Sequence, residues 1–168
     1  WRTGQGAQFA LFPNMHAADP VWRTLNRDVR YRRALSMAID RTQVNHVLYF
    51  GLATESNNTV VADSPLFRDE YRTKWTKFDL KAANALLDEI GLTRGHDGIR
   101  RLPAGRPLEV IVETAGESTE QTDILELIRE SWKEAGIKLF SKPSQREVLR
   151  NRVFAGEAVM TVWSGLDN

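Results

Sequence analysis

The pattern of apolar and polar positions is most regular in the last third of the chain. Short apolar runs there predict strands over residues 108–113, 137–140 and 158–163. Apolar side chains at helical spacing predict helices over residues 119–135 and 144–155, each followed by a glycine. The apolar stripe of the longer helix consists of Ile124, Leu125, Ile128, Trp132 and Ala135. Strands that alternate with helices in this way predict a parallel sheet with right-handed crossovers.

Polar caps mark the start of four of the predicted helices. Ser144, with Glu147 three residues later, has the pattern of a capping box. Three aspartates precede apolar positions at helical spacing and predict further helices, at about 28–39 after Asp28, 41–50 after Asp40 and 80–90 after Asp79. These four helices therefore each begin with a side chain that can accept a bond from a free backbone N–H.

The remaining segments have no clear period. An apolar run at 9–12 predicts a short strand, and residues 16–26 are predicted to be a loop. Residues 99–113 have the pattern of a hairpin whose first strand is 99–102. Residues 52–78 form a long irregular connection, which is uncommon in a compact domain unless the segment has a function.

Length and composition are those of an ordinary globular domain. The 168 residues suffice for one domain with its own core, and 42% of them are hydrophobic and 27% charged. The absence of cysteine excludes disulfides and thiolate metal sites but leaves the compartment open. No apolar run is long enough to span a membrane, and there is no signal peptide. Because the chain lacks an initial methionine and stops just after a predicted strand, we expect it to be part of a longer protein.

Charge argues against a dedicated nucleic-acid binder. Twenty-three basic residues face 22 acidic ones, a net charge of +1, whereas such proteins usually carry a basic excess on one face. Arginines nevertheless cluster at positions 27, 30, 32, 33 and 41. They fall between apolar positions, with Arg30, Arg33 and Arg41 on a solvated side, which is typical of the outer face of an amphipathic helix. A docking or phosphate-contacting surface is the alternative.

The topological rule for open α/β sheets places ligands beyond the carboxyl ends of the strands. Here it selects the loop at 114–118, after the first parallel strand, and the loop at 164–168, after the last. The candidate ligand-binding residues are Thr114, Gly116, Glu117, Trp163, Ser164, Gly165 and Asp167. The glycines would let a ligand approach the backbone, Trp163 would supply an apolar wall, and Asp167 would hold a cation or an amine. The alternative is a core tryptophan and an ordinary turn aspartate.

Patterns typical of enzymes are weak. The three histidines are scattered without metal-ligand spacing, and the nucleophile-elbow sequence G-x-S-x-G is absent, so we expect no metal and no other cofactor. The remaining enzymatic hypothesis is a hydrolase-like carboxylate cluster of Glu113, Glu117 and Asp167 at the strand ends. It would need a shifted pKa on at least one member.

Four motifs follow one another along most of the chain: D-V-R-Y-R-R-A-L-S-M-A-I-D-R (28–41), F-D-L-K-A-A-N-A-L-L-D-E-I-G-L (78–92), E-L-I-R-E-S-W-K-E-A-G-I-K-L (126–139) and F-A-G-E-A-V-M-T-V-W-S-G (154–165). In that order they resemble D-V-R-x-R-x-A-L-x-x-A-I-D-R, Y-D-P-x-K-A-K-A-L-L-x-E-A-G, a helix ending in L-x-K-I-G-I-x-V, and R-x-G-x-F-D-M-x-x-x-G-W-x-G. These are motifs of the family 5 extracellular solute-binding proteins, the oligopeptide- and dipeptide-binding receptors of ABC importers.

The resemblance implies an α/β fold of the type II periplasmic binding-protein class, with a largely parallel sheet flanked by helices. It also implies that residues 1–168 are a single excised lobe, most of the second ligand-binding lobe of a larger receptor. In such receptors two lobes hinge shut around a peptide or related solute, and the closed form docks on the membrane permease. We therefore expect a partner lobe, ABC permease subunits and a periplasmic or other extracytoplasmic location, free or lipid-anchored. We expect neither catalysis nor nucleic-acid binding.

The resemblance also bears on the solute. Peptide-binding relatives place an aspartate for the ligand's amine where this chain has Leu166, one residue before Asp167. Dipeptide-binding relatives carry a basic residue for the ligand carboxylate in the loop after the strand matching 108–113, and residues 113–117 contain none. These departures favour a longer peptide held through its backbone, or a cationic or sugar-like solute.

Overall fold

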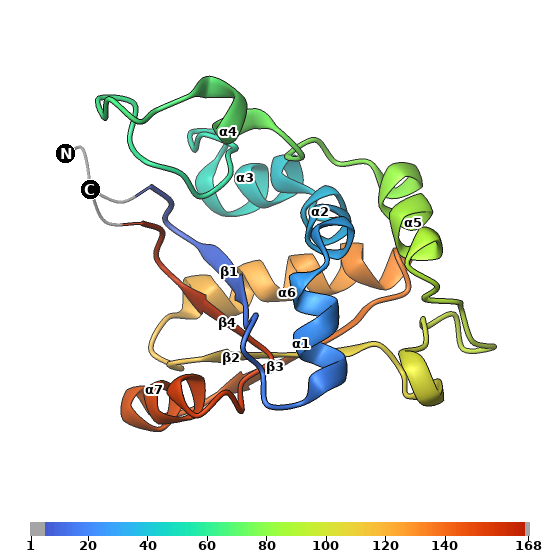
Figure 1. Cartoon of the computed structure of the whole chain (residues 1–168). Coiled ribbons are helices and arrows are strands. Elements are labelled where there is room, and N and C mark those ends of the chain that lie inside the picture. The colour runs from blue at the N-terminus through green and yellow to red at the C-terminus, as the bar shows by residue number, and fades with distance from the viewer. Residues whose placement is uncertain (1–5, 167–168) are drawn as a thin grey trace.

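One mixed sheet runs through the centre of the molecule (Figure 1). The computed structural model describes residues 6–166, and within them the strands are β1 (Ala10–Pro13), β2 (Glu109–Thr114), β3 (Lys138–Pro143) and β4 (Met160–Trp163). Their order across the sheet is β1-β4-β2-β3. β2 pairs in parallel with β3 and with β4, whereas β1 pairs antiparallel with β4. The predicted parallel unit is confirmed, with one antiparallel strand at its edge.

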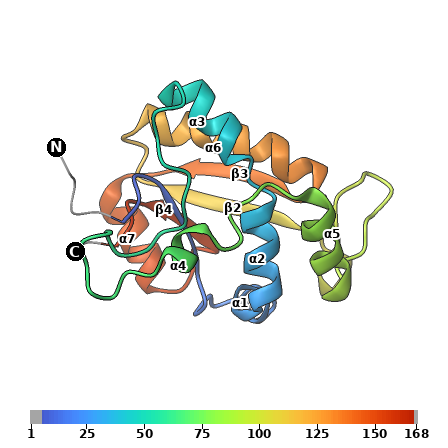
Figure 2. The ribbon, with the colours of Figure 1, turned by 90° about the horizontal axis from the view of Figure 1, so that it is seen from above.

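Helices cover both faces of this sheet. The crossovers α6 (Thr119–Glu134) and α7 (Arg146–Phe154) lie on opposite faces (Figure 1), because they cross the sheet in opposite directions with the same hand. The other helices are α1 (Pro20–Arg27), α2 (Val29–Met37), α3 (Arg41–Tyr49), α4 (Asp69–Thr73) and α5 (Leu80–Glu89). α2 packs against α5, and α3 packs against α6 (Figure 2). No helix in the described part of the chain is long and apolar enough to cross a membrane.

The main core lies between the sheet, α6 and α2. Val110 and Val112, alternate residues of β2, are buried. Trp132 of α6 is also buried, and its Nε1 donates to the Leu35 carbonyl oxygen of α2 at 3.2 Å. The whole predicted stripe of α6 is buried, so the helical pattern correctly locates this core.

Two segments predicted to be irregular contain helices. α1 lies mostly within the predicted loop at 16–26, where Asp19 accepts a bond from the Val21 N–H at 2.8 Å and Pro20 takes the first helical position. The loop prediction is wrong because an N-cap followed by proline is also a helix start. α4 is a single short helix within the otherwise irregular connection at 52–78.

Residues 99–102 do not form the first strand of a hairpin. They make only isolated bridges, such as the one between Arg100 and Arg94. Arg100 is buried, and its Nε donates to the Ala135 carbonyl oxygen at 2.9 Å. The predicted hairpin is present only as one antiparallel bridge, between Arg101 and Pro107, across the turn at Pro103–Gly105. The predicted strand is absent because Arg100 bonds to the end of α6 instead, through its side chain and through its N–H, which donates to the Gly136 carbonyl oxygen at 2.8 Å.

Candidate functional site

The two loops predicted to bind a ligand lie at the same edge of the sheet. β2 and β4 are parallel neighbours with Glu113 opposite Thr161, so their carboxyl ends point the same way. The loop at 114–118 follows β2, and residues 164–166 follow β4. Asp167, also predicted to bind, lies outside the described residues. The strand ends thus converge as the topological rule requires.

The loop after β3 reaches this edge too, and it brings Arg146, the first residue of α7, to both predicted loops. Arg146 Nη2 donates to Glu117 Oε2 at 2.6 Å, and its guanidinium carbon lies 5.4 Å from the centre of the Trp163 ring. Trp163 is 45% exposed, so it is not a core residue. Sequence analysis missed Arg146 because it begins a helix and does not follow a strand directly. The predicted capping box of Ser144 and Glu147 is absent, since no side-chain hydrogen bond caps α7.

The loop after β2 is a tight turn. Thr114 is buried, and its Oγ1 accepts the Gly116 N–H at 3.3 Å. Gly116 has a φ of +69°, a conformation that residues with a Cβ rarely adopt. Thr114 therefore shapes the turn, while Gly116 and Glu117 are the exposed candidates of this loop.

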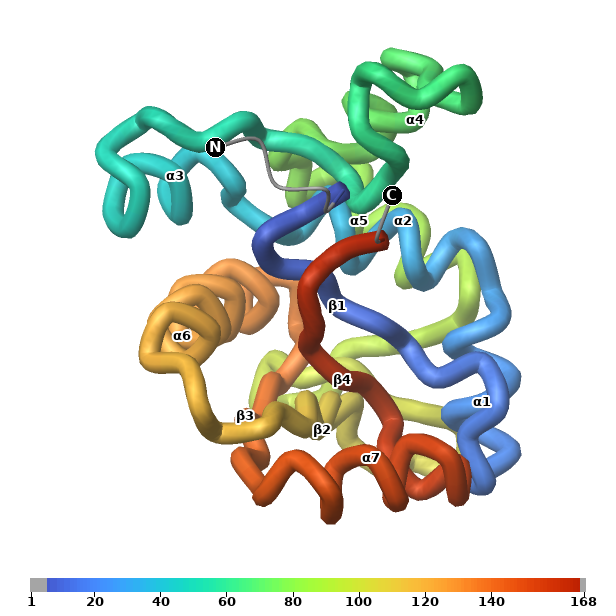
Figure 3. The backbone as a smooth tube through the Cα atoms, turned by 90° about the vertical axis from the view of Figure 1, so that its left-hand side faces the viewer, coloured from blue at the N-terminus to red at the C-terminus, as the bar shows by residue number. Residues whose placement is uncertain are grey.

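The loop after β4 packs against the N-terminal segment, and the two lie side by side (Figure 3). The Gly165 N–H donates to the Ala7 carbonyl oxygen at 2.7 Å, and the Leu166 N–H donates to Asn58 Oδ1 at 2.9 Å. A Cβ at Gly165 would lie 2.3 Å from Ala7 N, so a glycine is needed there. The sequence analysis expected a ligand to approach the backbone at Gly165. In the structure the backbone of Ala7 lies there. Ser164 is partly exposed.

Arginines neutralise the acidic residues of this edge. Glu113 is buried, and its two carboxylate oxygens accept from Arg152 at 2.8 Å each. The Arg152 guanidinium holds the pKa of Glu113 below its usual range, although burial opposes this shift. A carboxyl that acts as a general acid needs a raised pKa, so the geometry gives the carboxylate-cluster hypothesis no support. Within residues 6–166, no three His, Asp or Glu side chains form a metal site.

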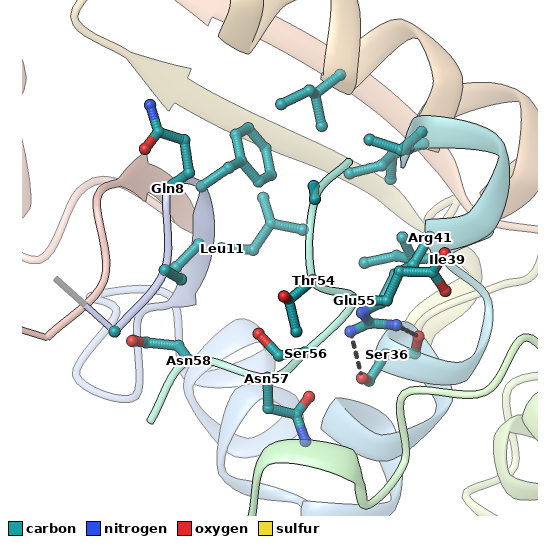
Figure 4. A pocket seen from close by; sticks show the side chains of 18 of the residues that line it. Gln8, Leu11, Ser36, Ile39, Arg41, Thr54, Glu55, Ser56, Asn57 and Asn58 are labelled. Atoms are coloured by element: carbon teal, nitrogen blue, oxygen red, sulfur yellow. Dashed lines mark hydrogen bonds between the residues drawn. The ribbon is translucent and has the colours of Figure 1, made fainter. Parts of the chain in front are cut away.

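An open cleft of about 950 Å³ adjoins the loop after β4 (Figure 4). Its walls are the start of β1, residues of α2 and α3, and residues 53–58 of the irregular connection. Ala7 and Asn58 line the cleft and also bond Gly165 and Leu166, so the cleft and the loop are continuous. A volume of this size is typical of pockets that hold small molecules.

Most polar side chains of this cleft are neutral amides and hydroxyls. They include Gln8, Ser36, Thr54, Ser56, Asn57 and Asn58 (Figure 4). Apolar surface comes from Phe9, Leu11 and Ile39. The cleft therefore combines many hydrogen-bonding groups with little free charge.

Arg41 is half-buried in the wall of this cleft, which corrects its predicted place on a solvated side. Its Nη1 donates to the carbonyl oxygens of Ser36 at 2.7 Å and Thr76 at 3.1 Å. Burial lowers the pKa of Arg41 to about 10, and the charge of Glu55 opposes that shift. α2 ends at Met37 and Arg41 begins α3, the separate helix that the sequence also predicts, so the helical spacing that relates Arg30 to Arg33 does not extend to Arg41.

Asn45 of α3 holds the irregular segment in the cleft wall. Its Nδ2 donates to the Ala53 carbonyl oxygen at 2.9 Å, and its Oδ1 accepts the Ala53 N–H at 3.0 Å. Nδ2 also lies 3.3 Å from Glu55 Oε1. The sequence analysis did not identify these residues of the cleft wall. The one feature of the sequence that pointed to them was the unusual length of the irregular connection at 52–78.

A largely parallel sheet flanked by helices, with converging strand-end loops and an adjacent open cleft, is an arrangement found in the periplasmic binding-protein class. Residues 2–168 match the family described as bacterial extracellular solute-binding proteins, family 5 Middle. The chain belongs to this family, whose members are solute-binding proteins of ABC importers.

Known relatives agree with this assignment. The periplasmic alpha-galactoside-binding protein of Rhizobium meliloti (strain 1021) is 34% identical over 86 residues, 50% of this chain and 12% of that protein. The oligopeptide-binding protein OppA is similar in structure with a TM-score of 0.92 and 32% identity, over 98% of this chain and 26% of that one. An oligopeptide-binding protein of Thermus thermophilus, solved with a pentapeptide, shares the fold with a TM-score of 0.79 and 23% identity, over 95% of this chain and 28% of that one. The chain thus spans about a quarter of the length of these solved proteins.

Proposed function

We propose that this chain is one lobe of the solute-binding component of an ABC importer and captures an oligopeptide or related solute. The proposal rests on the open cleft beside the loop after β4. The exposed Trp163 ring and the Glu117–Arg146 ion pair lie at the same strand ends but do not line the cleft. Together, the cleft and these groups offer apolar surface, charge and neutral hydrogen-bonding groups, the combination that small-molecule sites use. Such a receptor binds and releases its solute without chemistry.

A two-lobed receptor is supported by the course of the chain at this edge. β1 and β4 are antiparallel neighbours, and beyond them the Gly6 N–H donates to the Leu166 carbonyl oxygen at 2.8 Å. Two adjacent segments of this kind suit a hinge to a partner lobe, because hinges need only a few residues. The partner lobe would close over the open cleft, and the closed form would dock on ABC permease subunits in the periplasm or another extracytoplasmic location.

An oligosaccharide is the second candidate solute. Sugar hydroxyls both donate and accept hydrogen bonds, as do the hydroxyls of Thr54 and Ser56, and the Asn58 amide adds both kinds of group. The 34% identity with an alpha-galactoside-binding protein supports the same candidate.

Calorimetry on the full-length, two-lobed protein tests the proposal. The probes are a library of peptides of two to six residues and the α-galactoside raffinose. We expect the peptide library to bind the full-length protein, and this chain alone to bind it roughly 100-fold more weakly because it lacks the covering lobe.

Each other outcome of this titration is informative. Equal affinity in the full-length protein and in this chain would contradict the two-lobed receptor. Binding of raffinose alone would select the second candidate solute. Binding of neither probe would contradict the proposed function.

A further inference from the structure

The segment at 53–58 connects the cleft to the proposed hinge. Each of its residues lines the cleft. Its last residue, Asn58, accepts the Leu166 N–H through Oδ1 at 2.9 Å. Figure 3 shows that this end of the segment meets the two parts of the chain that form the hinge, residues 6–7 and 164–166. One side chain therefore contacts both the cleft and the hinge.

The packing at this junction is close. A Cβ at Gly165 would lie 2.5 Å from Asn58 Oδ1, and a Cβ at Gly6 would overlap the Thr59 carbonyl oxygen. Glycines allow the cleft wall and the hinge to approach one another to this degree. A change in the position of Asn58 would therefore displace the backbone of the hinge.

The other end of the Asn58 amide is open to the cleft. Within residues 6–166, Asn58 Nδ2 donates to no protein acceptor, although it carries two N–H groups. Asn57 differs, because its Nδ2 donates to the carbonyl oxygens of Tyr71, at 3.2 Å, and Lys74. The two asparagine side chains point in different directions (Figure 4). Asn58, unlike Asn57, thus has a donor to offer a solute.

We propose that Asn58 is a positioning residue that couples solute binding to the hinge, with Nδ2 donating to an oxygen of the solute while Oδ1 accepts the Leu166 N–H. This inference rests on the proposed function. It applies to both candidate solutes, because peptide carbonyl groups and sugar hydroxyl groups each offer an acceptor oxygen. A solute bound at Nδ2 restricts rotation of the amide and so stabilises the bond to Leu166. The cleft and the hinge are then linked by one side chain.

Hydrogen–deuterium exchange of the Leu166 amide in the full-length protein tests the coupling. The probes are the peptide library and raffinose, each at saturating concentration. In wild type, we expect the probe that binds to slow this exchange at least about fivefold, because the solute stabilises the bond between Asn58 and Leu166.

Asn58→Asp separates the two ends of the side chain. It keeps an acceptor for the Leu166 N–H but loses the donor for the solute. Without a probe, the Leu166 amide should therefore exchange at the wild-type rate, and a saturating probe should not slow it. Calorimetry should show roughly tenfold weaker binding of the probe, because one hydrogen bond to the solute is lost. Asn58→Ala loses both ends, so Leu166 should exchange at least about tenfold faster even without a probe.

The matched control is Thr54→Val. Thr54 lines the same wall of the cleft, and within the described part of the chain it makes no hydrogen bond to the hinge. A saturating probe should therefore slow the Leu166 exchange of this variant as it does in wild type. Far-UV circular dichroism checks that each variant folds.

Several outcomes would overturn the coupling. If the bound probe leaves the Leu166 exchange of wild type unchanged, the coupling is wrong and the proposed function stands. The same holds if the probe slows this exchange equally in Asn58→Asp, because closure alone would then protect the amide. A wild-type exchange rate in Asn58→Ala would show that the bond from Leu166 does not form. If no probe binds the full-length protein, both proposals fail.

Discussion

Glu113 shows how the fold decides the role of a single residue. The alternation along its strand leaves open whether this carboxylate faces a cleft or solvent. In the structure its side chain is 2% exposed and lies between Arg152 of α7 and Lys142 of β3. No local pattern predicts these partners, because the first lies 39 positions away along the chain. Sequence thus identifies the charged residue, and only tertiary packing identifies its partners.

Glu113→Gln should lower the free energy of unfolding by about 2 kcal/mol, because it leaves two cations without their shared buried carboxylate. Urea denaturation measures this change. Glu109→Gln is the matched control on the same strand, since Glu109 pairs with Lys138 in an exposed position and should contribute less than about 1 kcal/mol. Equal losses in the two variants would contradict the buried ion pair.

The same residue predicts a loss of stability in acid. Arg152 holds the pKa of Glu113 in the folded chain below the ordinary value of 4.5 that applies when the chain unfolds. The stabilisation by Glu113 is therefore complete above pH 4.5 and is lost as the pH falls through the folded-state value. Melting temperatures measured below this pH should fall more steeply for wild type than for Glu113→Gln. Parallel curves would show that Glu113 carries no such shift.

Among the secondary-structure elements, the sequence predicts best those that pack through one apolar face. α6 is an example, since its stripe is regular over several turns and the whole stripe is buried. The segment at 53–58 is the opposite case. Its position is fixed by hydrogen bonds to residues distant in the sequence. For example, the Asn57 N–H donates to the Arg72 carbonyl oxygen at 2.8 Å. Such bonds produce no regular spacing of apolar residues in the sequence. The strand-end loops of the site were predictable from topology, whereas this wall of the cleft was not.

Asn45→Ala should loosen the segment at 53–58 without unfolding α3. The Ala53 N–H would lose its acceptor, so its amide should exchange with solvent at least about tenfold faster, as hydrogen–deuterium exchange can measure. Gln43→Ala, an exposed change on the same helix, should leave that exchange rate unchanged. Unchanged protection of Ala53 in Asn45→Ala would show that other contacts hold the segment.

For the whole molecule, the five clustered arginines serve the fold. Their contacts are Arg27 with the Met15 carbonyl oxygen, Arg30 with Asp28 and Glu89, Arg32 with the Asn26 carbonyl oxygen, Arg33 with the Trp75 ring, and Arg41 with Ser36 and Thr76. These contacts divide the cluster among several neighbours. The net charge of +1 adds no general attraction for a polyanion.

We therefore expect no complex with duplex DNA in a gel-shift titration at about 50 mM salt, where electrostatic binding is strong. A complex that weakens steeply as salt is added would contradict this expectation. It would also reopen the alternative of a phosphate-contacting surface.

The strand order β1-β4-β2-β3 has a consequence for biosynthesis. Among the described strands β1 pairs with β4 alone, and Ala10 lies opposite Trp163, so the first of the described strands needs the last of them as its partner. On the ribosome, β2, α6 and β3 can assemble while β1 waits with its apolar side chains uncovered. β1 is thus made before the other described strands but is covered after them, and this interval is when a chaperone has most to protect.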